Sequence, residues 1–261
     1  RPMTAKCPLL LAGFALVLLG GCAQLPSNES DRVARLWVQP GPGAQEAPPA
    51  QAPGTRLSPW QHQTFPGKRR NQYAYVWRDG RPAMGVSSES GISAMRQTMN
   101  QAPSSLGLIR FSWKVDRLIA DADLQQAGKE DSPVRLVLVF DGDRSRFSAR
   151  DAMLSELARA VTGEELPYAT LMYVWSNQLP EGTVVNNRRT ERIRKLVIQS
   201  GADGVNRWLD YERDIRADYE RVFGEPPGAL RAVAVMTDTD NTGSAVQAWY
   251  GPVQLRPQAA P

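Results

Sequence analysis

Hydrophobic and polar side chains alternate along much of the chain. Between residues 108 and 116, Ile109, Phe111, Trp113 and Val115 share one face of an extended segment, and the residues between them are polar or charged. This period of two predicts a strand with one buried face, as in an antiparallel sheet. The same pattern, or an apolar run between turn residues, brings the total to eight or nine strands, including 73–77, 134–140, 170–175, 183–185, 192–199, 232–236 and 245–253.

Two segments follow the helical period instead. A helix is predicted at 149–161, with Ser148 as its N-cap and Gly163 at its end. Its apolar residues are Met153, Leu154, Leu157 and Val161. A second helix is predicted at 204–223, with an apolar stripe of Trp208, Ile215, Tyr219 and Val222. Many strands with two helical insertions predict a mainly β fold, an antiparallel β-sandwich.

The amino-terminal segment has the features of a secretion signal. Residues 9–19 are an apolar run, long enough for a signal peptide and too short to cross about 30 Å of hydrocarbon. Gly20 and Gly21 then precede Cys22, which is similar to the lipobox of bacterial lipoproteins, where the cysteine thiol is lipidated. An ordinary signal peptide with a stray cysteine is the alternative. We expect residues 1–22 to be a lipoprotein signal peptide with Cys22 as the lipidation site.

The next segment predicts a tether. Residues 23–56 are rich in proline, glycine and alanine, a composition that does not build a core. Apolar residues at 33–38 could still dock on the domain or on a partner. The predicted β-sandwich then spans 57–256, followed by a short tail at 257–261. Ala23, directly after the lipobox cysteine, favours sorting of the lipoprotein to the outer membrane.

Composition excludes several classes of protein. The chain has 31 Lys and Arg against 27 Asp and Glu, and the basic residues are dispersed, so we expect no nucleic-acid partner. His62 is the single histidine, which leaves one candidate for any histidine-dependent catalysis or metal binding. The sequence has neither a phosphate-binding glycine motif nor a Gly-x-Ser-x-Gly nucleophile motif.

Seven ordered segments between Trp60 and Leu255 resemble one bacterial family. They are residues 87–95, 109–116, 130–143, 169–187, 218–227, 233–243 and 248–251. The family is catalogued as domain of unknown function 3047. The resemblance implies an envelope protein and a jelly-roll sandwich similar to galactose-binding and carbohydrate-binding modules, with no assigned activity. Pro252 departs from the acidic residue that the family tends to have after the final Tyr-Gly, so a carboxylate that could help a metal site is absent.

A loop rich in oxygen ligands follows the strand at 232–236. Asp238, Asp240 and Asn241 lie within one predicted turn, and such hard oxygens suit Ca²⁺. These three residues are therefore the candidate metal ligands. The alternative is a hairpin loop in which the same side chains bond to the neighbouring backbone.

Two further carboxylates follow the strand at 134–140. If Asp141 and Asp143 lay near residues 238–241, four carboxylates would converge and either shift their pKa values or recruit a cation. Asp141 and Asp143 are thus candidate ligand-binding residues. A simple Asp-Gly turn is the alternative.

An aromatic ring and two amides make a third candidate site. Trp175 and Asn177 end one predicted strand, and Asn187 follows shortly after. Aromatic faces pack on the C–H faces of sugars while amides bond to hydroxyl groups. These residues are candidates for binding a glycan, although aromatic residues at strand period usually belong to the core.

The interpretation that fits these features best is a lipoprotein of the outer membrane that faces the periplasm. Its sandwich would bind a glycan or another envelope component without catalysis. Its partners would be the membrane, through the lipid anchor, and that ligand. One alternative is a protein-docking or assembly factor of the envelope. The other is a carboxylate-based or Ca²⁺-assisted polysaccharide hydrolase or lyase, with the candidate acids Glu89, Glu130, Glu181 and Glu212.

Overall fold

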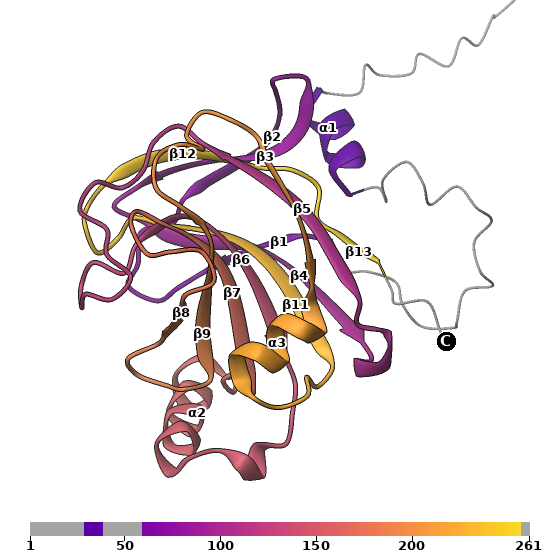
Figure 1. Cartoon of the computed structure of the whole chain (residues 1–261), viewed down its shortest axis with the longest axis vertical. Helices are drawn as coiled ribbons and strands as arrows, with labels where there is room; N and C mark the ends of the chain where they lie inside the picture. The colour runs from indigo at the N-terminus through magenta and orange to yellow at the C-terminus, as the bar shows by residue number, and fades with distance from the viewer. Residues whose placement is uncertain (1–28, 39–58, 257–261) are drawn as a thin grey trace, which may run out of the picture.

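A computed structural model describes residues 29–38 and 59–256 of the chain. Its strands form two sheets that pack face to face (Figure 1). The prediction of a mainly β sandwich is confirmed, with thirteen strands in the described part. The predicted signal peptide with Cys22, most of the predicted tether and the tail lie outside the described residues.

The larger sheet has the strand order β1-β4-β11-β6-β7-β9-β8. Its strands are β1 (Gln61–Thr64), β4 (Ile92–Gln101), β6 (Ser132–Phe140), β7 (Ala169–Ser176), β8 (Val184–Asn186), β9 (Ile193–Ser200) and β11 (Leu230–Asp238). The expectation of a wholly antiparallel sandwich is wrong for β7 and β9, which run parallel. The short strand β8 occupies the sheet edge, so the chain passes this edge before it returns as β9 beside β7.

The smaller sheet has the order β10-β5-β12-β3-β2, and β13 pairs with one end of β5. Its strands are β2 (Gln72–Arg78), β3 (Arg81–Glu89), β5 (Leu108–Val115), β10 (Leu209–Asp214), β12 (Ala245–Tyr250) and β13 (Gln254–Arg256). Strand β5 confirms the alternation at 108–116, because all four residues of its predicted apolar face are buried.

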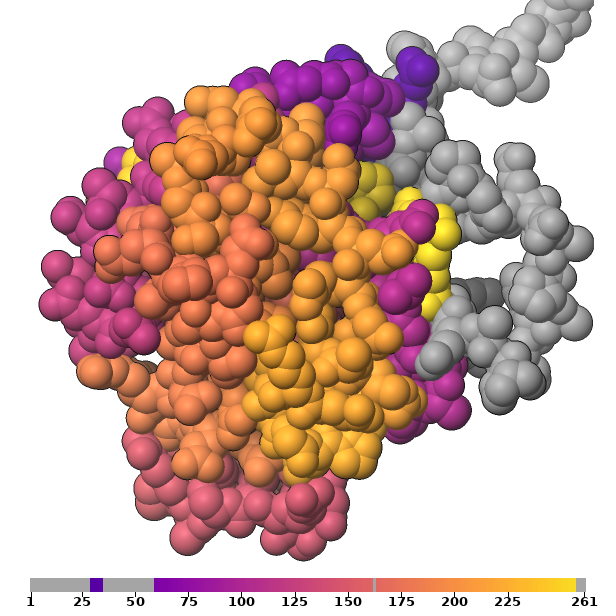
Figure 2. Space-filling model, in the orientation of Figure 1, coloured from indigo at the N-terminus to yellow at the C-terminus, as the bar shows by residue number. Residues whose placement is uncertain are grey.

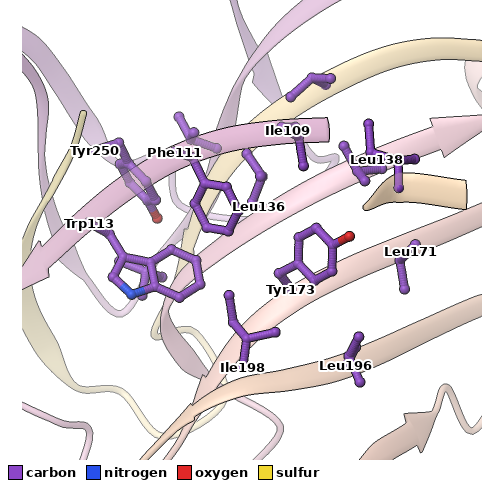
Figure 3. Close-up of a cluster of buried hydrophobic side chains, with 14 of the residues drawn as sticks. Ile109, Phe111, Trp113, Leu136, Leu138, Leu171, Tyr173, Leu196, Ile198 and Tyr250 are labelled. Atoms are coloured by element: carbon purple, nitrogen blue, oxygen red, sulfur yellow. The ribbon is translucent and has the colours of Figure 1, made fainter. Parts of the chain in front are cut away.

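An aromatic core joins the two sheets (Figure 3). Phe111 of β5 stacks on Tyr173 of the facing sheet, with 5.8 Å between ring centroids, and on Tyr211 of β10 at 5.3 Å. Trp113 and Tyr250 beside them are 0% and 1% exposed. Aliphatic residues of the larger sheet complete the cluster: Leu136, Leu138, Leu171, Leu196 and Ile198.

Within residues 29–38 and 59–256, three α-helices accompany the sheets: α1 (Glu29–Val38), α2 (Ala149–Thr162) and α3 (Ile215–Phe223). Helix α2 confirms the first predicted helix, since Ser148 accepts a hydrogen bond from the Asp151 N–H and Gly163 ends the helix with a φ of 79°. None of the described helices is long and apolar enough to cross a lipid bilayer.

Helix α1 falls within the segment predicted as a tether. It packs against β2 and β3, and its Val33 is 0% exposed. The apolar residues at 33–38 that could dock on the domain are therefore part of a helix that does so.

The second predicted helix, at 204–223, is only half correct. Its first part is strand β10, whose side chains alternate between half-buried and exposed, and β10 pairs with β5. Helix α3 begins after Asp214, whose carboxylate accepts a hydrogen bond from the Ala217 N–H at 3.0 Å. The spacing of seven between Trp208 and Ile215 suits a helix, but pairing with β5 determines the backbone there.

Phe111→Ala removes the ring that contacts both sheets. We expect the free energy of unfolding to fall by about 3–5 kcal/mol, because burial is lost and a cavity remains. Urea denaturation followed by tryptophan fluorescence measures this loss. The control is Val184→Ala on edge strand β8, where the side chain is 37% exposed, with an expected loss below about 1 kcal/mol. Equal losses in the two variants would contradict this role for Phe111.

Candidate functional site

A groove of about 550 Å³ lies on the smaller sheet, on the side away from the core. On β5 and β10, Phe111 and Tyr211 point into the core, so the residues on either side of them point outward. The polar residues that line the groove are Arg81, Arg110, Ser112, Asp210, Glu212 and Gln254. Glu212, expected on a helix, therefore belongs to a strand that faces this groove.

The end of β12 creates the hollow. Strand β12 stops at Tyr250, opposite Met84, although β3 extends to Arg81. The Gly251 N–H donates to the Ser112 carbonyl at 2.9 Å. A Cβ on Gly251 would lie 2.1 Å from the Ser112 hydroxyl oxygen, so no side chain fits there. The chain then continues as β13 beside the other end of β5, which leaves a gap in the sheet surface.

Two ion pairs that join different strands line the groove. Arg81 lies 2.8 Å from Asp210, and Arg110 pairs with Glu212. The four side chains are 40–65% exposed. The Arg81 guanidinium also lies 5.4 Å from the ring centroid of Trp208. A ligand in the groove would thus meet cationic donors and carboxylate acceptors.

A second polar cluster lies where β6 begins and β11 ends. Carboxylate oxygens of Asp131, Asp238 and Asp240 lie within 4.8 Å of one another. Arg135 lies 2.7 Å from Asp238, and Lys68 forms an ion pair with Asp240. By their number and type, the three carboxylates could hold a hard cation such as Ca²⁺. Arg135 and Lys68 already balance much of their charge, so the cluster does not require a metal ion.

Asp131 holds the loop that follows β11, and sequence reasoning did not single it out. Its carboxylate accepts hydrogen bonds from the backbone N–H and side-chain amide of Asn241, at 3.2 and 2.9 Å. It also accepts from the N–H and hydroxyl of Thr242, at 2.8 and 2.7 Å. Asn241 is one of the predicted metal ligands. Its side-chain amide N–H instead helps to hold this loop in place. The alternative of side chains that bond to the neighbouring backbone fits Asp238, which accepts from the Asp240 N–H at 3.4 Å, whereas Asn241 bonds to a carboxylate from outside the loop.

The cluster extends to a buried lysine. Lys195 of β9 is 5% exposed, and burial together with the charge of Arg135 lowers its pKa to about 8. Burial raises the pKa of Asp238 to about 7 despite the opposing charge of Arg135. Burial would also raise the pKa of Asp240, but hydrogen bonds with Asp238 and Lys68 lower it. Charged residues inside the apolar strands β6 and β9 were a signal in the sequence for this cluster.

Asp141 and Asp143 do not converge with residues 238–241, and the alternative of a simple Asp-Gly turn describes this segment better. Strands β6 and β11 are antiparallel, so the end of β6 lies beside Leu230, at the start of β11. Asp141 accepts a hydrogen bond from the next backbone N–H at 2.9 Å. Asp143 accepts from the hydroxyl and N–H of Ser145, and these bonds lower its pKa. Both carboxylates shape turns at the far end of the sheet.

The three residues proposed as a sugar-binding face have structural partners instead. Trp175 is 1% exposed, and its indole N–H donates to a backbone carbonyl at 2.9 Å. The Asn177 amide donates to two carbonyls of the loop before β6, at 2.7 and 3.0 Å. Asn187 accepts from a backbone N–H two residues later at 2.8 Å. Trp175 thus belongs to the core, and the two amides support loops.

Comparison with protein families gives one match. The family described as "Protein of unknown function (DUF3047)" matches residues 58–254. A search of curated proteins finds no match.

Three solved structures are similar in overall fold. The xyloglucanase domain of NopAA, a type three effector from Sinorhizobium fredii, was solved with cellobiose; it is 9% identical with a TM-score of 0.36, covering 80% of this chain and 100% of that one. A family 12 xyloglucanase from Bacillus licheniformis, solved with a ligand, is 7% identical with a TM-score of 0.41, at 78% and 100% coverage. The cellulose induced protein Cip1 is 10% identical with a TM-score of 0.34, at 76% and 90% coverage. At these values we assign none of their activities to this chain.

Lys195→Met replaces the buried ammonium with an apolar side chain of similar length. The folded protein releases the Lys195 proton near pH 8, whereas the unfolded chain keeps it to about 10.4. Below pH 8 the folded state therefore carries the cost of a buried charge, and this cost disappears as the pH rises from 8 to about 10.4. We expect the variant to be more stable than the wild type at pH 7, with a gain that shrinks over that window.

Thermal unfolding at pH 7 and pH 10 measures this difference. Lys129→Met, a substitution of the same kind in the loop before β6, should give no such gain. A variant that is less stable than the wild type at pH 7 would show that Lys195 makes a net favourable ionic contribution to the cluster.

Proposed function

The chain belongs to the family described as Protein of unknown function (DUF3047), and we propose that it binds a glycan of the bacterial cell envelope, without catalysis, in the groove of the smaller sheet. The observation that carries this proposal is that two arginine–carboxylate pairs from three strands face one open groove. Sugar hydroxyl groups both donate and accept hydrogen bonds. Guanidinium and carboxylate groups side by side can satisfy both roles.

The dimensions and surroundings of the groove suit an oligosaccharide. Its volume of about 550 Å³ lies within the range of roughly 300–1,000 Å³ usual for ligand sites. Trp208 is fixed beside Arg81, because its indole N–H donates to the Arg78 carbonyl at 3.3 Å. An oligosaccharide that extends past Arg81 would reach this ring, which can pack on the C–H face of a sugar.

The environment of the groove carboxylates favours binding over hydrolysis. A general acid must hold its proton near neutral pH, which for a carboxyl group requires burial or a like charge nearby. Asp210 and Glu212 are 65% and 40% exposed, and each is paired with an arginine, so neither has the buried surroundings that such an acid needs. Asp238 has the raised pKa of such an acid, but it is 3% exposed and its carboxylate pairs with Arg135.

The cellular location is part of the proposal and rests on the sequence. The apolar run at 9–19 and the lipobox ending at Cys22 are the features that support export and lipidation. We propose that the protein is an outer-membrane lipoprotein whose sandwich faces the periplasm. Helix α1 would then lie close to the anchored end, because it starts seven residues after Cys22.

Arg110→Ala and Glu212→Ala each remove one side of a groove ion pair. We expect each variant to bind saccharides at least tenfold more weakly than the wild type, with an unchanged melting temperature. Isothermal titration of the full chain with cellohexaose, chitohexaose and a hexagalacturonate measures affinity for neutral, N-acetylated and acidic sugars. Arg69→Ala is the matched control, since Arg69 forms an exposed ion pair with Glu89 at 3.0 Å outside the groove.

Each of the other possible outcomes would support a different function or a different binding site. Release of shorter saccharides that stops in Glu212→Ala would identify a hydrolase or lyase in place of a binding protein. Binding that both groove variants retain would place the glycan elsewhere on the molecule. No binding of any saccharide would leave the protein-docking alternative as the better explanation.

A further inference from the structure

Helix α2 carries three of its four large apolar side chains on the outside. Met153, Leu157 and Val161 are 64%, 59% and 69% exposed. Their spacing of four residues places them along one side of the helix. Three alanines near them are also exposed: Ala149, Ala152 and Ala160. A continuous apolar stripe of this kind on a folded protein indicates an interaction surface.

Polar contacts attach α2 to the rest of the molecule. Asp151 and Ser155 are 4% and 5% exposed, and both lie on the side of the helix opposite the stripe. Asp151 accepts a hydrogen bond from the Thr190 hydroxyl, and Arg144 donates to the Ser155 hydroxyl at 3.1 Å. The stripe is therefore not needed to hold the helix in place. Figure 2 shows α2 at one end of the molecule.

The stripe is complementary to itself about Leu157. Met153 and Val161 lie four residues to either side. If two copies of α2 pack antiparallel about a two-fold axis, Leu157 meets Leu157 and Met153 meets Val161. An isologous interface needs this kind of self-complementarity.

We propose that α2 is the interface of a homodimer, in which two copies pair antiparallel through Met153, Leu157 and Val161. The alanines beside the stripe allow the two helices to approach closely. A helix of 14 residues is about 21 Å long and about 10 Å wide. It offers less than the roughly 800 Å² per partner of a standard interface. The dimer is therefore weak and depends on protein concentration.

The charges and position of α2 favour a second copy over a lipid surface. Helices that lie on membranes are rich in basic residues, but in α2 two acidic residues, Asp151 and Glu156, balance Arg150 and Arg159. Helix α1 begins soon after Cys22, and it lies at the opposite end of the fold from α2 (Figure 1). The stripe is thus remote from the end of the molecule that leads toward the predicted lipid anchor.

Sedimentation velocity of the full chain over a range of concentrations tests the dimer. We expect the wild type to show a reversible monomer–dimer equilibrium, and Leu157→Glu to weaken it at least tenfold. Val184→Glu places the same charge on another exposed apolar residue and should leave association unchanged.

Cysteine cross-linking tests the antiparallel orientation. In a chain with Cys7 and Cys22 changed to serine, Leu157→Cys should form a disulfide-linked dimer on oxidation. Met153→Cys alone should not, whereas a mixture of Met153→Cys and Val161→Cys chains should. A wild type that stays monomeric at all concentrations would overturn the proposal. Disulfide formation by Met153→Cys alone would overturn the antiparallel arrangement.

Discussion

The antiparallel pairing of β6 with β11 determines which polar residues of this protein meet. Leu136 lies opposite Val235 in the middle of the larger sheet, so the start of β6 and the end of β11 lie side by side at one end of the strands. Asp131 and Asp238 come together there, and Asp131 holds the loop after β11 by four hydrogen bonds. The same register places Asp141 at the opposite end of these strands. One strand pairing thus explains why Asp131 and Asp238 form a cluster and why Asp141 does not join it.

Local patterns predicted the elements well where a single face or cap decides the structure. The alternation at 108–116 corresponds to β5, and Ser148 and Gly163 bound α2 as expected. The pattern failed at β10, because its backbone depends on pairing with β5, which lies a hundred residues away in the chain. The groove could not be predicted for the same reason. Arg110 and Glu212 become neighbours only through that pairing, and the hollow exists because β12 ends beside Ser112.

Arginine–carboxylate pairs occur both in the buried cluster and in the groove. They differ in how readily they can bind a ligand, because their burial differs. Arg135 and Asp238 are each 5% exposed and bonded within the protein, so a ligand would have to displace a buried ion pair. In the groove, Arg81 and Asp210 are 45% and 65% exposed. Exposed pairs of this kind stabilise a fold by only about 0–1 kcal/mol. Exchanging such contacts for sugar hydroxyl groups therefore costs the fold little, which is why the groove is the better binding surface.

A shallow groove with exposed ion pairs implies modest affinity at a single site, because water competes for the same groups. Envelope glycans are polymers with many equivalent sites. Pairing through α2 would join two grooves in one particle, since the groove lies on the smaller sheet and stays clear of that helix. Once one groove of such a dimer has bound a polymer, binding of the same polymer by the other groove is intramolecular. Linking two sites in this way can raise the avidity by roughly 10²–10⁴ over that of a single site. A weak dimer interface and a weak glycan site would then reinforce each other, because binding to one polymer also raises the local concentration of the protein.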